Sequence, residues 1–275
     1  MTVVELTVSA LLFDNDGTIS DSTPAVRATI LGWCRSQGVD PRVFASSRHG
    51  TRTKDLLRQF ATTPKRGSEM SEAELDVATE EIERSVIVMA RDMRDRSEGL
   101  EEGIRMLPGV RNLLAQLRDA QANWGIVTSA TRTYACPALE TAGVGFEPPD
   151  VPFLVTGELV SGGKPHPEPY LTGLEELRKL SPTPIQGSDV LVIEDAPAGM
   201  ISGRAAGCKV LAVCTGPVPV ADVVQAAARV EGTLVVQDLS HVELVNCEGG
   251  KIKLRINTLD SDETVKECIS TDRAG

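Results

Sequence analysis

The chain has 275 residues, of which 41% are hydrophobic and 24% are charged. A chain of this length and composition can bury a sizeable core, which excludes a disordered protein and allows one large domain or two small ones. The formal net charge is −11, from 28 basic and 39 acidic residues, so we expect no nucleic-acid partner bound through a basic face. A locally positive pocket for an anionic substrate stays compatible with this charge, because salt screens charges over about 8 Å.

Neither a membrane span nor a secretory signal is predicted. The sequence contains no run of about 18 apolar residues, and its first residues lack the basic and apolar regions of a signal peptide. Six cysteines are present and none forms a Cys-x-x-Cys pair. We therefore expect reduced thiols and a cytoplasmic protein. The sequence carries no signal for an oligomeric state.

The first half of the chain begins with a strand and continues with helices. A short apolar run over Thr7–Phe13 predicts a buried strand that ends at Asp14-Asn-Asp-Gly17. The patterns that follow predict a helix over 24–38, a loop over 42–52, a short helix over 54–60, and a long amphipathic helix after the capping box Ser71-Glu-Ala-Glu74. We expect residues 22–100 to form a helical insertion after the first strand.

From Leu107 onward, strands alternate with helices. The predicted strands cover 124–128, 153–155, 190–193, 210–213 and 234–236. This alternation predicts an α/β fold with a parallel sheet and helices on both faces. A hairpin with a Gly249-Gly250 turn is expected after about residue 242, followed by an acidic tail. The expected core domain consists of residues 1–21 and 101–275.

Four polar segments follow the predicted strands or lie in the loops between them. They are Asp14-Asn-Asp-Gly-Thr18, Thr128-Ser129, Lys164 and Glu194-Asp195. In open α/β sheets, ligands bind beyond the carboxyl ends of the strands. We therefore expect these segments to meet at one edge of the sheet and to form a site there.

The two aspartates suit phosphoryl transfer. An Asp near its reference pKa of about 3.9 is ionised at pH 7, so Asp14 could attack phosphorus directly. Asp16 could protonate the leaving alkoxide and then activate water. The alternative is a turn with carboxylate caps, because Asp-Gly is a common turn dipeptide.

The acidic pair and the lysine could complete such a site. Glu194 and Asp195 could form an oxygen-lined Mg²⁺ site with Asp14, and the cation would offset the repulsion between the carboxylates and a phosphate. The alternative is a pair of solvated carboxylates at a strand end. Lys164 lies among rigid Gly and Pro neighbours outside any P-loop pattern, which favours a positioned lysine over an ordinary surface one.

Taken together, these segments resemble the haloacid dehalogenase superfamily of aspartyl-phosphate phosphatases from about Ala10 to Val213. The signature D-x-D-G-T stands here as Asp14–Thr18, the second motif as Ile126-Val-Thr-Ser129, the third as Lys164 and the fourth as Glu194-Asp195. The resemblance implies a Rossmann-like core, with residues 22–100 as a helical cap, and Mg²⁺ as the cofactor.

The resemblance also implies a role for each matching residue. Asp14 would be the nucleophile and Asp16 the general acid and base, with its backbone carbonyl also binding Mg²⁺. Glu194 and Asp195 would complete the metal site, with Asp195 as the firmer ligand. The phosphate and the substrate would be contacted by Asn15, Thr128, Ser129, Arg132 and Lys164.

Two longer stretches narrow the resemblance to a subgroup. Residues 163–171 and 193–199 resemble the fungal glycerol-phosphate and 2-deoxyglucose-6-phosphate phosphatases. In that subgroup a cap loop with His-Gly-x-Arg-Thr reaches the active site, which makes His49 and Arg52 candidate substrate contacts, although a solvated basic loop is the alternative. The glycerol-phosphate enzymes carry a bulky aromatic where Thr51 stands, so we expect a roomier pocket here.

The sequence therefore predicts a Mg²⁺-dependent phosphomonoester hydrolase that acts on a small phosphorylated polyol or sugar. Three alternatives stay open at this point. The protein could dephosphorylate a larger lipid or terpenoid phosphate, which the small Thr51 would suit. It could be a phosphomutase, which would use the same residues. It could also bind phosphate without catalysis, although a binder does not need the full residue set.

Overall fold

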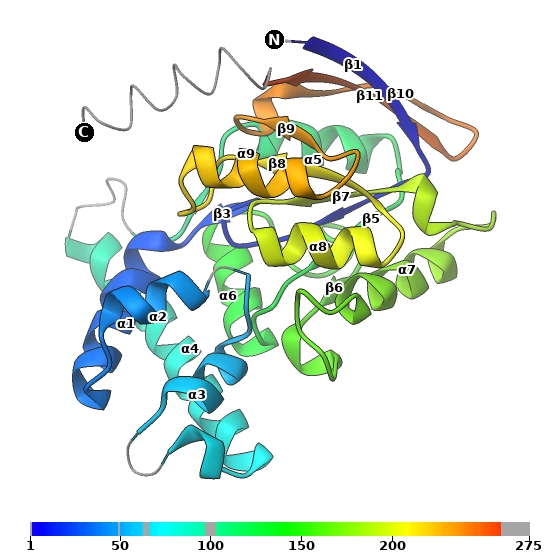
Figure 1. The fold of residues 1–275 in the computed structure, drawn as a ribbon. Helices are drawn as coiled ribbons and strands as arrows, with labels where there is room; N and C mark the ends of the chain where they lie inside the picture. Colours follow the sequence, from blue (N-terminus) through cyan, green and yellow to red (C-terminus); the bar gives the residue numbers. More distant parts are fainter. Residues whose placement is uncertain (1, 49, 63–65, 97–102, 260–275) are drawn as a thin grey trace.

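A computed structural model describes residues 2–48, 50–62, 66–96 and 103–259 (Figure 1). Its centre is a six-stranded parallel sheet in the order β6-β5-β2-β7-β8-β9. These strands are β2 (Ala10–Phe13), β5 (Trp124–Val127), β6 (Leu154–Val155), β7 (Val190–Glu194), β8 (Lys209–Val213) and β9 (Leu234–Val236). Counted along the chain, the spatial order is 3-2-1-4-5-6, so the strand order reverses between β2 and β7. The predicted α/β fold with a parallel sheet is confirmed.

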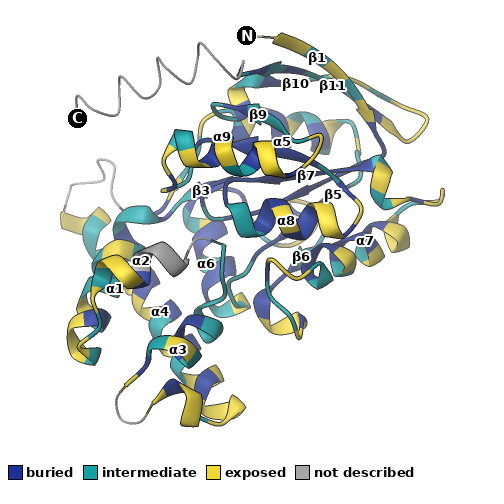
Figure 2. Ribbon diagram, viewed as in Figure 1, coloured by how far each residue is buried: buried dark blue, intermediate teal, exposed yellow. Residues whose placement is uncertain are grey.

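Helices cover both faces of this sheet. Successive side chains of each strand point to opposite faces, and the apolar side chains on both faces pack against helices. Leu11 and Phe13 point into the core shared with α5 (Val110–Asp119) and α6 (Arg132–Thr141), whereas Leu12 points into the opposite core with α7 (Glu168–Leu180). Helices α8 (Pro197–Ala205) and α9 (Val220–Arg229) pack against β7–β9. The central strands are therefore buried along their length (Figure 2), which explains why they read as continuous apolar runs.

Among its described residues, the segment 22–104 contains four α-helices that lie beside the sheet (Figure 1). They are α1 (Thr23–Gln37), α2 (Pro41–Arg48), α3 (Thr53–Phe60) and α4 (Glu72–Arg96). The two ends of this segment are brought together by a short antiparallel ribbon of β3 (Ser20–Asp21) and β4 (Arg105–Met106). The expected capping box is present, because Ser71 and Glu74 exchange hydrogen bonds at the start of α4.

The prediction of a loop over 42–52 is wrong for its first part, which forms α2. The start signal is Asp40-Pro41: an Asp40 carboxylate oxygen accepts a bond from the backbone N–H of Arg42 at 2.8 Å, and Pro41 suits the first helical position. Phe44 then packs between Trp33 and Phe60, with ring centroids 5.2 and 5.4 Å away. The pattern missed α2 because this helix is short and only its contacts with other helices identify its apolar face.

The prediction of one strand over Thr7–Phe13 also needs correction. The chain forms β1 (Thr2–Val8), breaks at Ser9, and continues as β2. β1 joins the predicted hairpin, β10 (Val242–Glu248) and β11 (Lys251–Thr258), in an antiparallel sheet of order β1-β11-β10. At the break, the backbone N–H of Ser9 donates to Asp189 and its hydroxyl accepts from Lys251. An apolar run does not reveal that its two halves pair with different sheets.

Two further expectations can be compared with the described residues. None of the helices described here is both long and apolar enough to cross a bilayer. The cysteines at 34, 136, 208, 214 and 247 are free thiols, as expected. The acidic tail beyond residue 259 lies outside the described residues.

We expect Leu254→Ala to destabilise the whole protein by about 2–5 kcal/mol. Leu254 is fully buried in the same core cluster as Leu11 and Phe13, so the late hairpin completes the main core. The matched control is Lys253→Ala on the same strand, whose side chain is 37% exposed and pairs with exposed Glu5, and which should cost less than about 1 kcal/mol. Urea unfolding of both variants measures the difference. Equal costs would contradict the structural role of the hairpin.

Candidate active site

The four predicted segments meet at the carboxyl edge of the sheet, at the reversal of strand order. Asp14 follows β2 and Asp195 follows β7, and the backbone N–H of Asp14 donates to Ile193 at 3.0 Å. Thr128 follows the neighbouring strand β5 and is also buried. The strands end together because their parallel pairing aligns Phe13 with both Ile126 and Ile193.

A buried lysine joins these strand ends. The Lys164 Nζ donates to Asp14 Oδ1 at 2.6 Å, to Glu194 Oε1 at 2.6 Å and to the carbonyl of Val127 at 3.0 Å. Its side chain is fully buried. The three bonds use all three donors of the ammonium group, which explains how a charged side chain is accommodated there. The structure thus brings Lys164, Asp14 and Glu194 together as the sequence predicts.

Acidic groups outnumber the lysine in this cluster. Burial raises the pKa of Asp14 to about 8, which Lys164 opposes and Glu194 reinforces. Burial and the neighbouring Asp14 also raise the pKa of Asp195 well above its usual range. Without a cation, the pKa of Asp14 therefore lies above the reference value used in the sequence analysis. Asp14 and Glu194 outweigh the effect of burial on Lys164 and raise its pKa, so the lysine stays charged.

The residues present fit a hard divalent cation. Asp14, Glu194 and Asp195 can each offer a carboxylate oxygen within 4.8 Å of one another, and all three residues are buried. Oxygen-only donors are those that Mg²⁺ prefers, and a cation would supply the positive charge that one lysine does not. Space is kept free beside Asp195, because a Cβ on Gly17 or Gly216 would lie 2.1 or 1.7 Å from its Oδ2.

The carboxylates of Asp14, Glu194 and Asp195 differ in how many protein donors already bind them. Glu194 Oε1 accepts from Lys164 and from the Tyr170 hydroxyl at 2.7 Å, and its Oε2 accepts from the backbone N–H of Ala196 at 3.2 Å. Glu194 is therefore held by protein donors at both oxygens. This arrangement favours Asp195 as the direct ligand, with Glu194 orienting Lys164.

Asp16 is held by three side chains on the loop and on α6. Its Oδ1 accepts from the Ser22 hydroxyl at 2.6 Å and from the Tyr134 hydroxyl at 2.5 Å, and its Oδ2 accepts from Asn15 at 3.2 Å. Asn15 is itself fully buried and also accepts from Ser20. The Asn15 side chain thus orients Asp16, whereas the family resemblance implies a contact with the phosphate.

Both tyrosines of the chain donate to carboxylates of this site, and the sequence analysis missed both. Tyr134 and Tyr170 are buried, and a buried tyrosine hydroxyl usually finds an acceptor. The sequence could have indicated both tyrosines, because each lies on a helix that follows a predicted phosphate-binding segment. Ser22 carried no such signal, since only the loop geometry brings it to Asp16.

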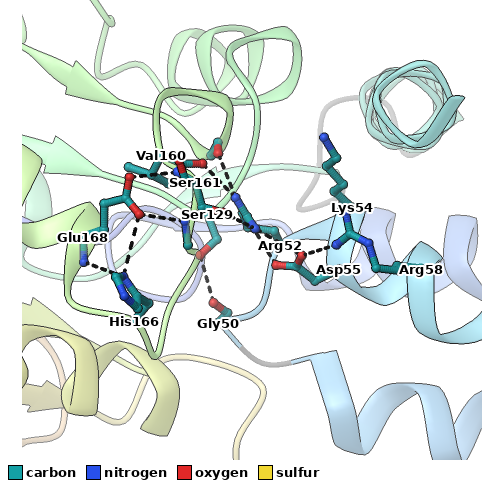
Figure 3. A network of polar contacts seen from close by, with 12 residues as sticks. Gly50, Arg52, Lys54, Asp55, Arg58, Ser129, Val160, Ser161, His166 and Glu168 are labelled. Atoms are coloured by element: carbon teal, nitrogen blue, oxygen red, sulfur yellow. Dashed lines mark hydrogen bonds and ion pairs between the residues drawn. The ribbon is translucent and has the colours of Figure 1, made fainter. Parts of the chain in front are cut away.

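Residues at the start of α3 and in the loop before it contact the core. Figure 3 shows Arg52 between α3 and the loop before Lys164. Its guanidinium donates to the carbonyls of Val160 and Ser161 at 2.9 and 3.1 Å, and it also pairs with Asp55. Nearby, the Ser129 hydroxyl donates to the carbonyl of Gly50 at 2.8 Å. Arg52 therefore fastens α3 to the loop that carries Lys164.

The remaining predicted contacts do not converge on the aspartates. Arg132 pairs with Glu147 at 3.1 Å and is 54% exposed, because it begins α6 on the outer side. The phosphate-binding roles of Arg52 and Arg132 stay predictions that this geometry does not support. His49 lies outside the described residues.

A cavity opens above the two aspartates, between the sheet edge and helices α1–α4. It encloses about 1000 Å³ of empty space, including the part that opens to solvent. Asp14, Asp16, Thr128 and Asp195 line its inner end, and Thr51 lines the side formed by the helices. A substrate phosphate at the inner end would therefore place its organic group against the helices.

Glu83 is an unpredicted carboxylate on the helical side of this cavity. It lies on α4, is 4% exposed, and accepts bonds from the backbone N–H and the hydroxyl of Thr131, where α6 begins. Burial raises its pKa to about 7, although Thr131 and Thr53 act in the opposite direction. The Glu83–Thr131 contact joins the long helix of the insertion to the core.

A Rossmann-type parallel sheet with carboxylates gathered where its strand order reverses is typical of an enzyme of the α/β class. The chain belongs to the haloacid dehalogenase-like hydrolase family, whose model matches residues 11–213. This match confirms the resemblance found in the sequence.

Curated relatives from bacteria and yeast cover most of the chain. Hexitol phosphatase A of Escherichia coli is 37% identical over 74% of this chain and 81% of its own. Glycerol-1-phosphate phosphohydrolase 2 of Saccharomyces cerevisiae is 32% identical over 77% of each chain. 2-Deoxyglucose-6-phosphate phosphatase 2 of the same yeast is 30% identical over 92% of this chain and 97% of its own. These relatives confirm the predicted subgroup.

The fold is also similar to that of a solved β-phosphoglucomutase from Clostridium difficile. The two structures align with a TM-score of 0.64 over 98% of this chain and 100% of the other, at 18% identity. A likeness at this identity concerns the fold alone.

We expect Glu83→Gln to gain stability relative to the wild type as pH rises from 5 to 8. Folded Glu83 keeps its proton up to about pH 7, against 4.5 for the ordinary group. The folded state therefore binds more protons between these values, and the wild-type free energy of unfolding falls there by up to about 3 kcal/mol. Glutamine has no such loss and can still accept from Thr131.

Urea unfolding at pH 5 and pH 8 measures this difference between the two proteins. The matched control is Glu80→Gln. Glu80 lies one turn away on α4 and its side chain is 52% exposed, so the free energy of unfolding of this variant should change between the two pH values as that of the wild type does. A Glu83→Gln protein that also follows the wild type would show that Glu83 does not titrate in this range.

Proposed function

We propose that this protein is a Mg²⁺-dependent phosphomonoester hydrolase that works through an aspartyl-phosphate on Asp14. The observation that carries the proposal is the position of Asp14, buried at the end of β2 with its Oδ1 2.6 Å from the Lys164 Nζ. The family match and the three relatives named as phosphatases or a phosphohydrolase support the same reaction class.

In the first step, Asp14 attacks phosphorus and the bond between phosphorus and the ester oxygen breaks. Asp16 gives its proton to the leaving oxygen, which departs as the alcohol. Lys164 fixes the Asp14 carboxylate and offsets negative charge beside the transferring phosphoryl group, with Thr128 as a donor to the phosphate. Such groups act by positioning and by stabilising charge, which account for most of the catalysis in phosphoryl transfer.

In the second step, Asp16 takes a proton from water, and the water oxygen attacks phosphorus. The bond between phosphorus and Asp14 breaks and inorganic phosphate forms. Ser22, Tyr134 and Asn15 hold Asp16 in one orientation throughout. Asp14, Asp195 and the Asp16 carbonyl would hold Mg²⁺, which when bound neutralises the charge of the carboxylates and the phosphate.

We further propose that residues 22–100 act as a cap over this site. The β3–β4 ribbon lies at the two ends of the segment, and Arg52, Ser129 and Glu83 contribute to its contacts with the core. A cap that covers the cavity excludes water and completes the substrate pocket. A cytoplasmic location suits an enzyme that has free thiols and acts on phosphorylated metabolites.

Two classes of alcohol are candidates for the leaving group. The names of the relatives favour a small phosphorylated polyol or sugar. The apolar residues around the cavity favour a larger, apolar alcohol. Both classes give free inorganic phosphate, which separates a hydrolase from a mutase.

We expect Asp14→Asn to lose at least about 10⁴-fold in phosphate release, because an amide oxygen is a poor nucleophile and the covalent route is closed. Phosphate release from a panel of monoesters, with Mg²⁺ and with EDTA, measures the loss. The matched control is Asp189→Asn at the opposite end of β7, whose side chain is 42% exposed and which should keep full activity. Substantial turnover by folded Asp14→Asn would contradict the mechanism.

We expect Tyr134→Phe to lower kcat about 10- to 100-fold with little change in KM. The variant removes one of the donors that hold Asp16, so proton transfer by Asp16 is slowed while binding of the phosphate is not affected. Steady-state kinetics measured across a pH range give kcat and KM. The pH dependence of kcat should change on the side that reports the ionisation of Asp16. A variant with wild-type kcat and an unchanged pH profile would show that Tyr134 does not position Asp16.

A further inference from the structure

The cavity above Asp14 has one polar end and one apolar wall. Asp14, Asp16 and Thr128 line the polar end. The apolar wall comes from the helical insertion and comprises Val26 and Ile30 of α1, Phe44 of α2, Leu56 and Leu57 of α3, and Ile82 and Val86 of α4. Four different helices thus turn large hydrophobic side chains toward one space.

Part of the apolar wall is not sealed inside the core of the insertion. Val26, Ile30 and Ile82 are only half-buried, and each lines the cavity. Apolar surface that faces a water-filled cavity is unfavourable, and an apolar ligand group would remove it from water. Ligand pockets typically combine such a wall with a few polar groups that fix orientation.

Two polar groups on the same side, Ser22 and Glu83, are engaged with the protein itself. The Ser22 hydroxyl donates to Asp16, and Glu83 accepts from Thr131 and from the Thr53 side chain. Among the described residues that line the cavity, none is Lys or Arg. A second phosphate or a chain of hydroxyls on the substrate would therefore meet few partners there.

We infer that the leaving group is a bulky, mainly apolar alcohol of the prenyl class, so that the substrate is its phosphate monoester. This inference rests on the proposed function and names the substrate for the same site. The phosphate lies against Asp14 and Thr128, and the branched hydrocarbon covers the apolar wall. The reaction consumes one water, breaks the bond between phosphorus and the ester oxygen, and releases the alcohol and inorganic phosphate.

The physical reason is the cost of unpaired hydroxyls. A sugar or polyol placed against the apolar wall loses hydrogen bonds to water and gains few in return. A prenyl chain loses nothing comparable, and each buried methylene strengthens binding by about fourfold. Thr51, which is small and lines the cavity, leaves room for a branched chain.

The experiment measures kcat/KM for phosphate release by the full chain with Mg²⁺. The substrates are glycerol 1-phosphate, a hexitol phosphate, and the dimethylallyl, geranyl and farnesyl monophosphates, kept below the concentration at which the longer esters form micelles. We expect kcat/KM to rise about tenfold or more per added isoprene unit until the wall is covered. The prenyl esters should exceed both polyol esters.

Two wall variants and one control identify where the chain binds. Val26→Thr keeps the size of the side chain and adds a hydroxyl, and Ile82→Asn places an amide on the opposite helix. Each should lower kcat/KM for geranyl phosphate at least tenfold more than kcat/KM for glycerol 1-phosphate. Val88→Asn lies on the same helix as Ile82 but is 61% exposed, and it should change neither value.

The outcomes separate this inference from the proposed function. Efficient release from polyol esters with little from prenyl esters would overturn the inference and keep the mechanism. Prenyl turnover that Val26→Thr and Ile82→Asn do not alter would also overturn it.

If no ester releases phosphate, the proposed function fails. Binding then tests the inference, measured as the change in melting temperature of the same protein with geranyl phosphate. A shift larger than that with glycerol 1-phosphate, and lost in Val26→Thr, would support it, and no such difference would overturn it.

Discussion

The bond from the Lys164 ammonium to Asp14 and Glu194 is the contact on which the site depends. It brings together the ends of β2 and β7 and the loop after β6, with Nζ 2.6 Å from each carboxylate. A buried ammonium is tolerated only when all its donors are paired, and a buried carboxylate cluster only when positive charge balances it. The sheet must therefore end all its central strands at one level, which its parallel register does. The excess of negative charge makes this edge suitable for a divalent cation and then for a phosphate.

The helical insertion is linked to this edge by contacts of a different kind. Arg52 donates to carbonyls of the loop that leads to Lys164, and Glu83 accepts from the first residues of α6. Any movement of the helices over the cavity would have to break these bonds first. The same helices supply the apolar wall, so the contacts that hold them also set the position of the wall over Asp14.

The sequence predicted most of the elements for identifiable reasons. The central strands are buried on both faces, so they read as apolar runs, and the capping box marked the start of α4. The pairing of β1 with β11 was missed because its two partners are separated by almost the whole chain. Helix α2 was missed because it is short and only its contacts with other helices define its apolar face. The tyrosines at 134 and 170 were missed because only packing shows where a hydroxyl points.

The sequence by itself determined the chemistry at the sheet edge. The spacing of Asp14 and Asp16, and the position of Lys164 and Asp195 after apolar runs, required only that a parallel sheet align the ends of its strands. Tertiary structure alone decided how those groups are used. It turned Arg52 toward backbone carbonyls rather than toward the aspartates, assigned Glu194 to Lys164, and gathered side chains from four helices into one apolar wall. Such outcomes depend on contacts between residues far apart in the chain, which local periodicity and motif spacing do not encode.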